Sequence, residues 1–339
     1  MAELKVVRSV CLFTERPSKH SIARLNSLSG RLGGAGFTVQ TQRLCSPDVD
    51  SIFDMDRLGD GKTYLSLGQV KWDQSFSILD RLAHSRNVAF NVDLSNEAID
   101  AMHVKLIEAI IAKNPAKTFS FTYTFNNSPS SPFFPSATYQ RSGFAIGLQP
   151  TNLSAEATTV DEWLRRMRET WHEIDRLMAP EEDYLGIDTS IAPLFDGPSS
   201  FVNFIRRLGL DFGRTVTSDL FLKLASFIKE DSERRVGLCG LMFPCLEDFE
   251  LADEYEAGNF SVERCLFLSM QSGLGLDAYP LGVDEDPERI AEVLRLVQGL
   301  ANKHRKPLSA RFISDGRARI GERTALANPY LKDVAVRPL

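Results

Sequence analysis

Three short apolar runs within residues 184–282 each end in glycine or proline beside polar side chains. They are Leu185-Gly-Ile-Asp-Thr-Ser-Ile-Ala-Pro193, Val236-Gly-Leu-Cys-Gly-Leu-Met-Phe-Pro-Cys-Leu-Glu-Asp248 and Gly273-Leu-Gly-Leu-Asp-Ala-Tyr-Pro280. Short apolar runs bounded in this way predict buried strands. In α/β proteins, polar residues at the carboxyl ends of buried strands line ligand sites. We therefore expect a site where these three corners meet.

Strand and helix patterns alternate along the whole chain. Strands are expected at residues 5–13, 37–44, 64–67, 88–93, 118–125, 143–148, 184–188, 236–241, 276–279 and 308–313, with helical patterns between most of them and a short strand within 329–336. Such alternation predicts an α/β fold with a largely parallel sheet and helices outside it. Because no linker interrupts the pattern, we expect one domain over residues 1–339.

The charge balance narrows the range of partners. The 39 lysines and arginines are outnumbered by 45 aspartates and glutamates and form no basic cluster. A net charge of −6 without such a cluster argues against nucleic acid and against an anionic membrane. No apolar run approaches the ~20 residues of a membrane span. The five cysteines, odd in number and without metal-ligand spacing, favour reduced thiols in the cytoplasm.

Asp188 and Ser190 lie at the end of an apolar run that Pro193 terminates. The Asp188 carboxylate could cap the following turn or pair with Arg311. It could equally serve as a general base or a metal ligand at a strand end. We treat Asp188 as a candidate catalytic residue and Ser190 as a candidate substrate ligand.

Three further carboxylates follow the other two corners. Asp277 lies between glycines in an apolar segment, where a buried carboxylate needs a partner, and is a candidate acid or base. Glu247 and Asp248 open a helix, where the helix dipole alone favours acidic residues, and are candidate substrate ligands. A cation site built from these oxygens has no supporting spacing, so no metal site is predicted.

Cys239 and Arg311 are the remaining candidates in this half. Cys239, flanked by glycines, could be a nucleophile, but no histidine lies near it and a cysteine often serves as a small buried apolar group. Arg311 lies on a strand of otherwise small and apolar residues. An inward arginine there must meet a carboxylate from the protein or from a ligand. Arg311 is therefore the first candidate for substrate binding.

The loop Asn126-Asn-Ser-Pro-Ser-Ser-Pro-Phe-Phe-Pro135 is the most unusual segment of the chain. Its three prolines reduce the entropy lost on fixing the loop, and the amides of Asn126 and Asn127 both donate and accept hydrogen bonds. A covered surface loop and a ligand lid are both consistent with this composition. In the second case the two asparagines would contact the substrate.

Cofactor motifs are absent from the sequence. It contains no phosphate-binding Walker loop, no dinucleotide-binding glycine fingerprint after the first strand, no nucleophile elbow, no zinc-binding His-Glu-x-x-His and no Cys-x-x-Cys. The sequence therefore leaves the cofactor unknown.

Taken together, four stretches resemble the uncharacterised DUF711 family, also called UPF0210. They are Gly186-Ile-Asp-Thr-Ser-Ile-Ala-Pro193, Gly240-Leu-Met-Phe-Pro-Cys-Leu-Glu-Asp248, Gly275-Leu-Asp-Ala-Tyr-Pro280 and Lys306-Pro-Leu-Ser-Ala-Arg311. The tail Asn328-Pro-Tyr-Leu331 fits as well. The resemblance implies a closed α/β barrel of about ten strands, like the pyruvate formate-lyase barrel of glycyl radical enzymes. Two halves, about 1–150 and 151–339, would contribute to one sheet, with the site at the barrel mouth.

Chemistry does not follow from such a fold. The stretch Ser314-Asp-Gly-Arg-Ala-Arg-Ile-Gly321 lacks the Arg-Val-x-Gly pattern of a radical glycine, and Met270-Gln-Ser-Gly-Leu-Gly275 replaces a cysteine-containing run typical of relatives. We therefore expect a non-radical, cofactor-independent enzyme acting on a small anionic metabolite. A small-molecule sensor that binds without turnover is the alternative. The sequence leaves a homo-oligomer open.

Overall fold

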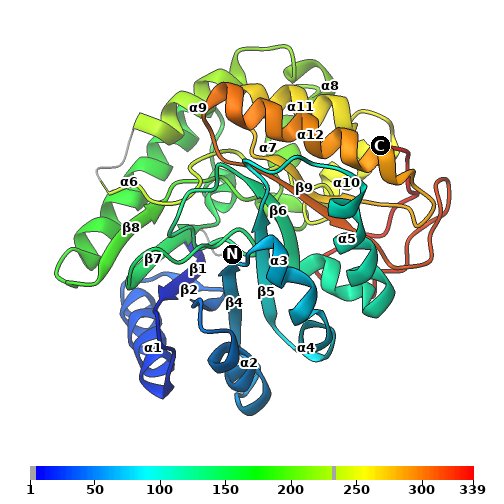
Figure 1. Ribbon diagram of the computed structural model, residues 1–339. Helices are drawn as coiled ribbons and strands as arrows, with labels where there is room; N and C mark the ends of the chain where they lie inside the picture. The colour runs from blue at the N-terminus through cyan, green and yellow to red at the C-terminus, as the bar shows by residue number, and fades with distance from the viewer. Residues whose placement is uncertain (1–4, 231–233) are drawn as a thin grey trace.

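The computed structural model describes residues 5–230 and 234–339, and its ten strands form one sheet with helices around it (Figure 1). The strand order is β8-β7-β1-β3-β4-β5-β6-β10-β9, with β2 paired to β1. The strands are β1 (Val6–Phe13), β2 (Thr38–Val39), β3 (Gln42–Cys45), β4 (Thr63–Gln69), β5 (Val88–Asp93), β6 (Phe121–Phe125), β7 (Gly143–Leu148), β8 (Tyr184–Asp188), β9 (Gly275–Pro280) and β10 (Leu308–Ile313).

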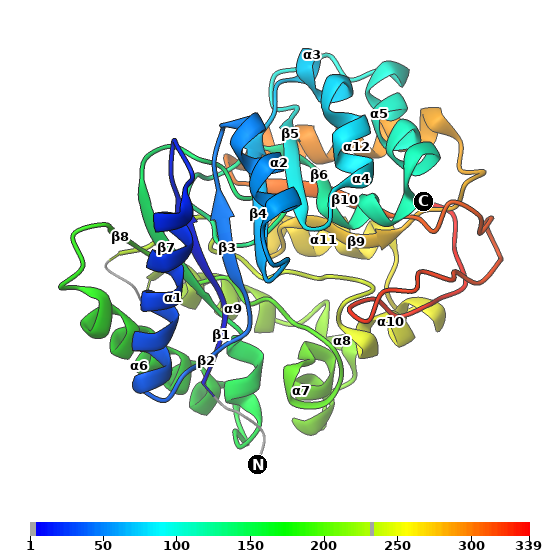
Figure 2. The same ribbon diagram turned by 90° about the horizontal axis from the view of Figure 1, so that it is seen from below.

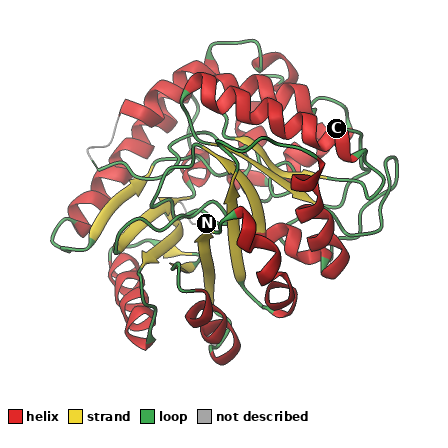
Figure 3. Cartoon of the chain, in the orientation of Figure 1, coloured by secondary structure: helices red, strands yellow, loops and turns green. Residues whose placement is uncertain are grey.

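The helices lie outside the strands, as the colouring of Figure 3 shows. They are α1 (Lys19–Gly34), α2 (Val49–Leu58), α3 (Trp72–Ser75), α4 (Leu79–His84), α5 (Ala101–Lys113), α6 (Val160–Met178), α7 (Phe201–Arg207), α8 (Phe212–Thr215), α9 (Leu220–Glu230), α10 (Phe249–Glu256), α11 (Val262–Gln271) and α12 (Pro287–His304). Short 3₁₀ turns are η1 (Phe76–Ile78), η2 (Pro115–Ser120), η3 (Pro150–Ser154) and η4 (Gly197–Ser199). The tail after β10 runs beside α10 (Figure 2), where Lys332 donates to the Leu246 carbonyl.

The sheet consists of two parallel groups that run in opposite directions. Strands β1, β3, β4, β5 and β6 are parallel to one another. Strand β7 is antiparallel to β1, and β8 follows the direction of β7. At the other side β10 is antiparallel to β6, and β9 is parallel to β10. The amino ends of the first group therefore share one edge with the carboxyl ends of the second.

The segment 234–248 lies between β8 and β9, the two ends of the strand order. It forms isolated parallel bridges to both sides: Ile187 pairs with Arg235, Ile191 with Leu241, and Pro244 with Asp277. The strand expected at residues 236–241 does not form as a regular element. Gly237 and Cys239 have φ values of +77° and +48°, which break the pleat of an extended strand.

On β1, β3 and β7, alternate residues face two different apolar layers. On β1, Val10 and Leu12 belong to the large core shared with the helices, which includes Leu25 and Leu28 of α1. Cys11 and Phe13 belong instead to a small cluster that packs against residues of the 126–142 loop, such as Ala137. The period of two thus separates the helix-covered face from an inner face that the chain covers with its own loop.

The loop 126–142 is largely buried against that inner face. Ser131 and Ala137 are fully buried. The Asn91 amide on β5 donates to the carbonyls of Pro135 (2.9 Å) and Ala137 (2.8 Å), which satisfies backbone groups that a buried loop would otherwise leave unpaired. A Cβ atom at Gly147 would come within 2.7 Å of the Phe133 ring, so glycine allows the close approach. The loop is an interior wall of the fold.

Candidate functional site

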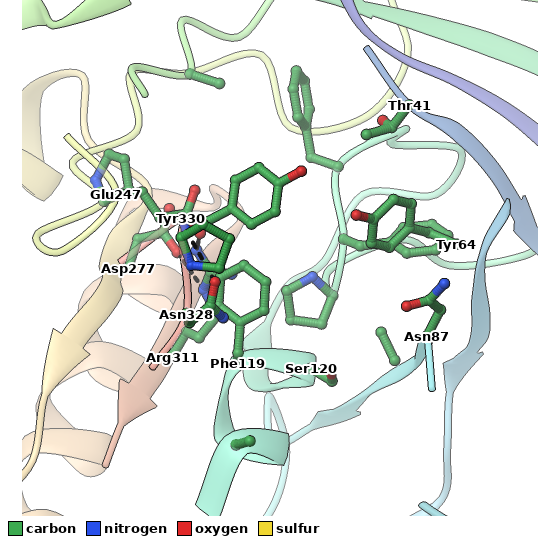
Figure 4. A pocket seen from close by; sticks show the side chains of 18 of the residues that line it. Thr41, Tyr64, Asn87, Phe119, Ser120, Glu247, Asp277, Arg311, Asn328 and Tyr330 are labelled. Carbon is green, nitrogen blue, oxygen red and sulfur yellow. Dashed lines mark hydrogen bonds and ion pairs between the residues drawn. The ribbon is translucent and has the colours of Figure 1, made fainter. Parts of the chain in front are cut away.

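A cavity of about 390 Å³ lies where the first group of strands begins and the second group ends. Arg8, Arg43 and Tyr64, near the starts of β1, β3 and β4, line one side. The other side is lined by Pro193, Glu247, Asp277 and Arg311 of the second group, by the loop residues 133–135 and by the tail residues 326–330 (Figure 4). The site was expected at the carboxyl ends of strands. This expectation fits the second group, whereas the strands of the first group reach the cavity with their amino ends.

Arg311 on β10 holds two carboxylates on the cavity wall. Its Nε donates to Asp277 Oδ1 (2.7 Å) and its Nη2 donates to Glu247 Oε1 (2.5 Å). The guanidinium lies 5.3 Å from the centre of the Phe119 ring, in a cation–π contact. Only 5% of Arg311 is exposed. The carboxylate partner that an inward arginine requires thus comes from the protein itself.

A β-bulge brings Asp277 to Arg311. Ala310 pairs with Leu276 and Phe312 pairs with Tyr279, so Arg311 alone stands opposite two residues of β9. Ala278 takes the left-handed conformation (φ +44°) that this bulge needs. Bulges of this kind redirect side chains and are common beside functional sites. Glu247 reaches the same guanidinium from the connection that leads into α10.

Burial and the neighbouring charges both shift the pKa of Asp277. Burial raises the pKa of Asp277; Arg311 opposes the rise and Glu247 adds to it. Although burial disfavours its charged form, Asp277 and Glu247 together raise the pKa of Arg311, which stays a cation. Burial of Asp277 therefore favours its protonated form. A carboxyl group with a raised pKa can act as a general acid and, once ionised, as a general base.

Arg8 and Arg43 form a second, cationic part of the wall. The Nη2 atom of Arg8 lies 3.6 Å from Glu247 Oε2. Arg43 is 8% exposed; its Nε donates to Thr41 Oγ1 (3.0 Å) and its Nη1 donates to the Pro132 carbonyl (3.3 Å). Within residues 5–230 and 234–339, no carboxylate lies within ion-pair distance of Arg43. Burial, and then Arg8, lower the pKa of Arg43 to about 10.

Tyr330, from the tail, lies between these two parts of the cavity. Figure 4 shows its ring between the Arg311 cluster and Tyr64. The ring stacks on Phe195 (5.7 Å between centroids) and on Phe119 (6.5 Å). Burial, and next its interaction with Tyr330, raise the pKa of the Tyr64 hydroxyl. The Tyr64 phenol is therefore a neutral hydrogen-bond donor at physiological pH.

Asp188 and Ser190 lie next to each other and do not line the cavity. Their side chains form hydrogen bonds to other segments of the chain. The Asp188 carboxylate accepts hydrogen bonds from Ser190 N (3.0 Å) and Oγ (2.6 Å), Ser131 Oγ (2.8 Å), Leu238 N (2.9 Å) and Cys239 N (3.1 Å). Asp188 is fully buried. Among the roles that the sequence left open for Asp188, this geometry shows the capping of a turn, and Arg311 pairs with other carboxylates.

The other candidates are also placed away from the cavity lining. Asp248 caps α10 by accepting from the backbone of Glu250 (3.2 Å) and Leu251 (3.3 Å). The Cys239 thiol donates to the Val236 carbonyl, and burial followed by Asp188 raises its pKa to about 11, so it is a thiol and not a thiolate at neutral pH.

The side-chain amides of Asn126 and Asn127 form hydrogen bonds within the protein. Asn126 Nδ2 donates to Asn302 Oδ1 (2.9 Å). Asn127 Nδ2 donates to the Ser136 carbonyl and to Thr138 Oγ1, both at 2.8 Å. The loop therefore presents Phe133, Phe134 and Pro135 to the cavity, and not its amides.

The structure thus brings Glu247, Asp277 and Arg311 together and adds Arg8, Arg43, Tyr64 and Tyr330, which sequence reasoning missed. The one available signal was Arg43, a charged residue within the short strand Gln42–Cys45. In the part of the chain that the structure describes, no group of three histidines, cysteines or acids is placed to hold a metal ion. None of the described helices has the length and apolar character needed to cross a membrane.

The fold and the cavity define an α/β protein with a charge-lined pocket at one edge of its sheet. The chain belongs to the DUF711 family, described as uncharacterised ACR, whose family model matches residues 71–327. The matched segment contains Glu247, Asp277 and Arg311. Among curated proteins, none matches the chain.

Proposed function

We propose that this protein is a non-radical, cofactor-independent enzyme that transfers a proton to and from a small anionic metabolite in the 390 Å³ cavity. The observation that carries the proposal is the sharing of Arg311 by Asp277 and Glu247 at the cavity wall. Asp277 acts as the acid or base, because burial favours its protonated form. Arg311 fixes the position of the Asp277 carboxylate and stabilises its charged form.

We further propose that the sheet works as a closed barrel of about ten strands, of the pyruvate formate-lyase type. The isolated bridges of Leu241 and Pro244 support this closure, since Leu241 pairs with both Ile191 and Gly273. A closed barrel encloses the cavity on all sides except the edge. This arrangement limits water and strengthens the electrostatic interactions on which proton transfer depends.

Solvent deuterium exchange tests the enzymatic role. The protein is incubated in D₂O with pools of small carboxylates and phosphate esters, and each compound is examined by NMR and mass spectrometry for deuterium uptake or conversion. We expect uptake or conversion with the wild type and with Asp73→Asn, an exposed carboxylate on α3 that serves as the matched control. Asp277→Asn should abolish it, because an amide cannot accept the proton.

A sensor is the second candidate. The hydrogen bonds from Arg311 to both carboxylates favour it, because a fully paired cluster also serves a pocket that only binds. A ligand that raises the melting temperature and is recovered unchanged, without deuterium uptake, would decide for the sensor.

A further inference from the structure

The cationic side chains that line the cavity differ in whether a carboxylate of the protein pairs with them. Arg311 is paired with two carboxylates, and Arg8 approaches Glu247. Lys117 donates its Nζ protons to the carbonyls of Ser85 and Arg86. Arg43 is buried and has no carboxylate at ion-pair distance among the described residues. An ionised group that is buried without a counter-charge is costly, so the position of Arg43 calls for an anion.

Arg43 is also held in a fixed orientation. Thr41 Oγ1 and the Pro132 carbonyl accept from Nε and Nη1, and the guanidinium lies 5.1 Å from the centre of the Phe134 ring. Its Nη2 has no hydrogen-bond partner within the described part of the chain. A fixed guanidinium with free donors suits a planar carboxylate, which accepts two parallel hydrogen bonds. Among the described residues that line the cavity, Arg43 is the buried arginine without a carboxylate partner, so a single negative charge on the ligand matches it.

The lining between Arg43 and the Arg311 cluster is apolar and aromatic. It includes Phe119, Phe133, Phe134, Met242 and the ring of Tyr330. Figure 4 shows Phe119 and Tyr330 facing the space between Asp277 and Tyr64. The cavity volume of about 390 Å³ is in the range of small-molecule pockets. A flat apolar body can pack against these rings, while Thr41, Asn87 and Ser120 keep other parts of the lining polar.

We infer that the ligand is a monocarboxylate on a flat apolar body, that Arg43 binds its carboxylate, and that the body extends across the aromatic lining toward Asp277. This inference rests on the proposed function and names its substrate class. It moves the anion from Arg311, which the sequence favoured, to the opposite wall. The reacting atom then lies at the far end of the body, next to the carboxylates that Arg311 holds.

Isothermal titration with four probes tests this assignment. The probes are 3-phenylpropionate, its uncharged amide, phenyl phosphate and acetate. We expect 3-phenylpropionate to bind at least about tenfold more tightly than each of the other three. In Arg43→Gln the preference for the carboxylate over the amide should disappear. Arg57→Gln, in an exposed ion pair with Asp54 on α2, is the matched control and should keep the preference.

Arg43→Lys keeps the positive charge and serves as a second variant if Arg43→Gln does not fold. It should retain part of the preference for the carboxylate over the amide. Four results would each overturn the inference: no binding of 3-phenylpropionate up to about 10 mM, equal affinity for acid and amide, tighter binding of phenyl phosphate or acetate, or an unchanged preference in both Arg43 variants. Selective binding without deuterium exchange on any compound would leave this inference standing and refute the enzyme proposal instead.

Discussion

Replacement of Arg311 by methionine should destabilise the protein strongly, because Arg311 lies at the centre of a buried ionic cluster. The side chains of Arg311 and Glu247 are 6% and 8% exposed, and that of Asp277 is 18% exposed. Methionine fills a similar volume but leaves both carboxylates without the guanidinium. Removing one partner of a buried ion pair costs about 3–5 kcal/mol. Arg8, 3.6 Å from Glu247, offsets part of this cost, so we expect about 4 kcal/mol.

Differential scanning calorimetry measures this effect. For a chain of 339 residues the unfolding entropy is about 0.7 kcal/mol per kelvin, so a loss of about 4 kcal/mol lowers the melting temperature by about 6 °C. Arg323→Met is the matched control: its ion pair with Glu256 (2.7 Å) is mostly exposed, with side chains 59% and 27% accessible. Exposed pairs contribute about 0–1 kcal/mol, so this variant should melt within about 1.5 °C of the wild type.

The pH dependence adds an internal check. Without the guanidinium, the pKa of Asp277 in the folded state rises further above its value in the unfolded state. The variant therefore gains stability as pH falls, and its difference from the wild type should narrow between pH 7 and pH 5. Arg311→Met combined with Asp277→Asn should recover part of the loss at pH 7. A melting temperature of Arg311→Met equal to that of the control, at both pH values, would refute the cluster as a source of stability.

Three further predictions concern other parts of the fold. Burial raises the pKa of Asp248 from 3.8 to about 6, so protonation of its carboxyl stabilises the fold fully below pH 3.8, and this stability is lost as pH rises through 6. Between pH 4 and pH 7 the wild type should lose about 2 kcal/mol relative to Asp248→Asn in urea unfolding, and parallel curves would contradict this. Gly275→Ala should lower the free energy of unfolding by at least about 2 kcal/mol, because the added Cβ would lie 2.1 Å from the Ser309 carbonyl oxygen at a φ of +96°. Gly299→Ala is the control: this residue lies in α12 with open space around it, so the substitution should raise the melting temperature. Ser200→Ala should cost about 1 kcal/mol by calorimetry, because Ser200 caps α7, and an unchanged melting temperature would show that the cap contributes nothing.

The order of strands and helices could be predicted well, because most strands are short apolar runs that pack into the helix-covered core. The strand expected at residues 236–241 did not form as a regular strand. Its apolar composition was correct, but Gly237 and Cys239 take left-handed backbone angles that a hydropathy pattern does not reveal. The pairing of this segment with Ile191 and Gly273 depends on neighbours far away in the chain.

A site residue could be predicted where the local sequence fixes its role, and could not be predicted where tertiary pairing fixes it. Arg311 could be predicted to meet a carboxylate, because a buried charge on an apolar strand is costly without a counter-charge. That the partner is Asp277 follows from a bulge in β9, which is set by tertiary pairing. Glu247 and Asp248 are adjacent, yet one faces the cavity and the other caps α10. Only the starting point of that helix distinguishes them.

The loop 126–142 is the part for which composition was least informative. Its prolines and asparagines are typical of exposed connections, and a buried loop is rare because its backbone groups need partners. Here Asn91 and Arg43, from strands β5 and β3, supply those partners. Neither strand contact could be inferred before the sheet order was known.

The opposite directions of the two strand groups change where natural variation should alter ligand choice. In most α/β proteins, connections that leave the strands evolve new specificities while those that enter them conserve the scaffold. In residues 5–125 of this chain the roles are reversed, since the segments entering β3, β5 and β6 reach the cavity. A mutant library aimed at new substrates should therefore randomise entering segments in the first half and leaving segments in the second.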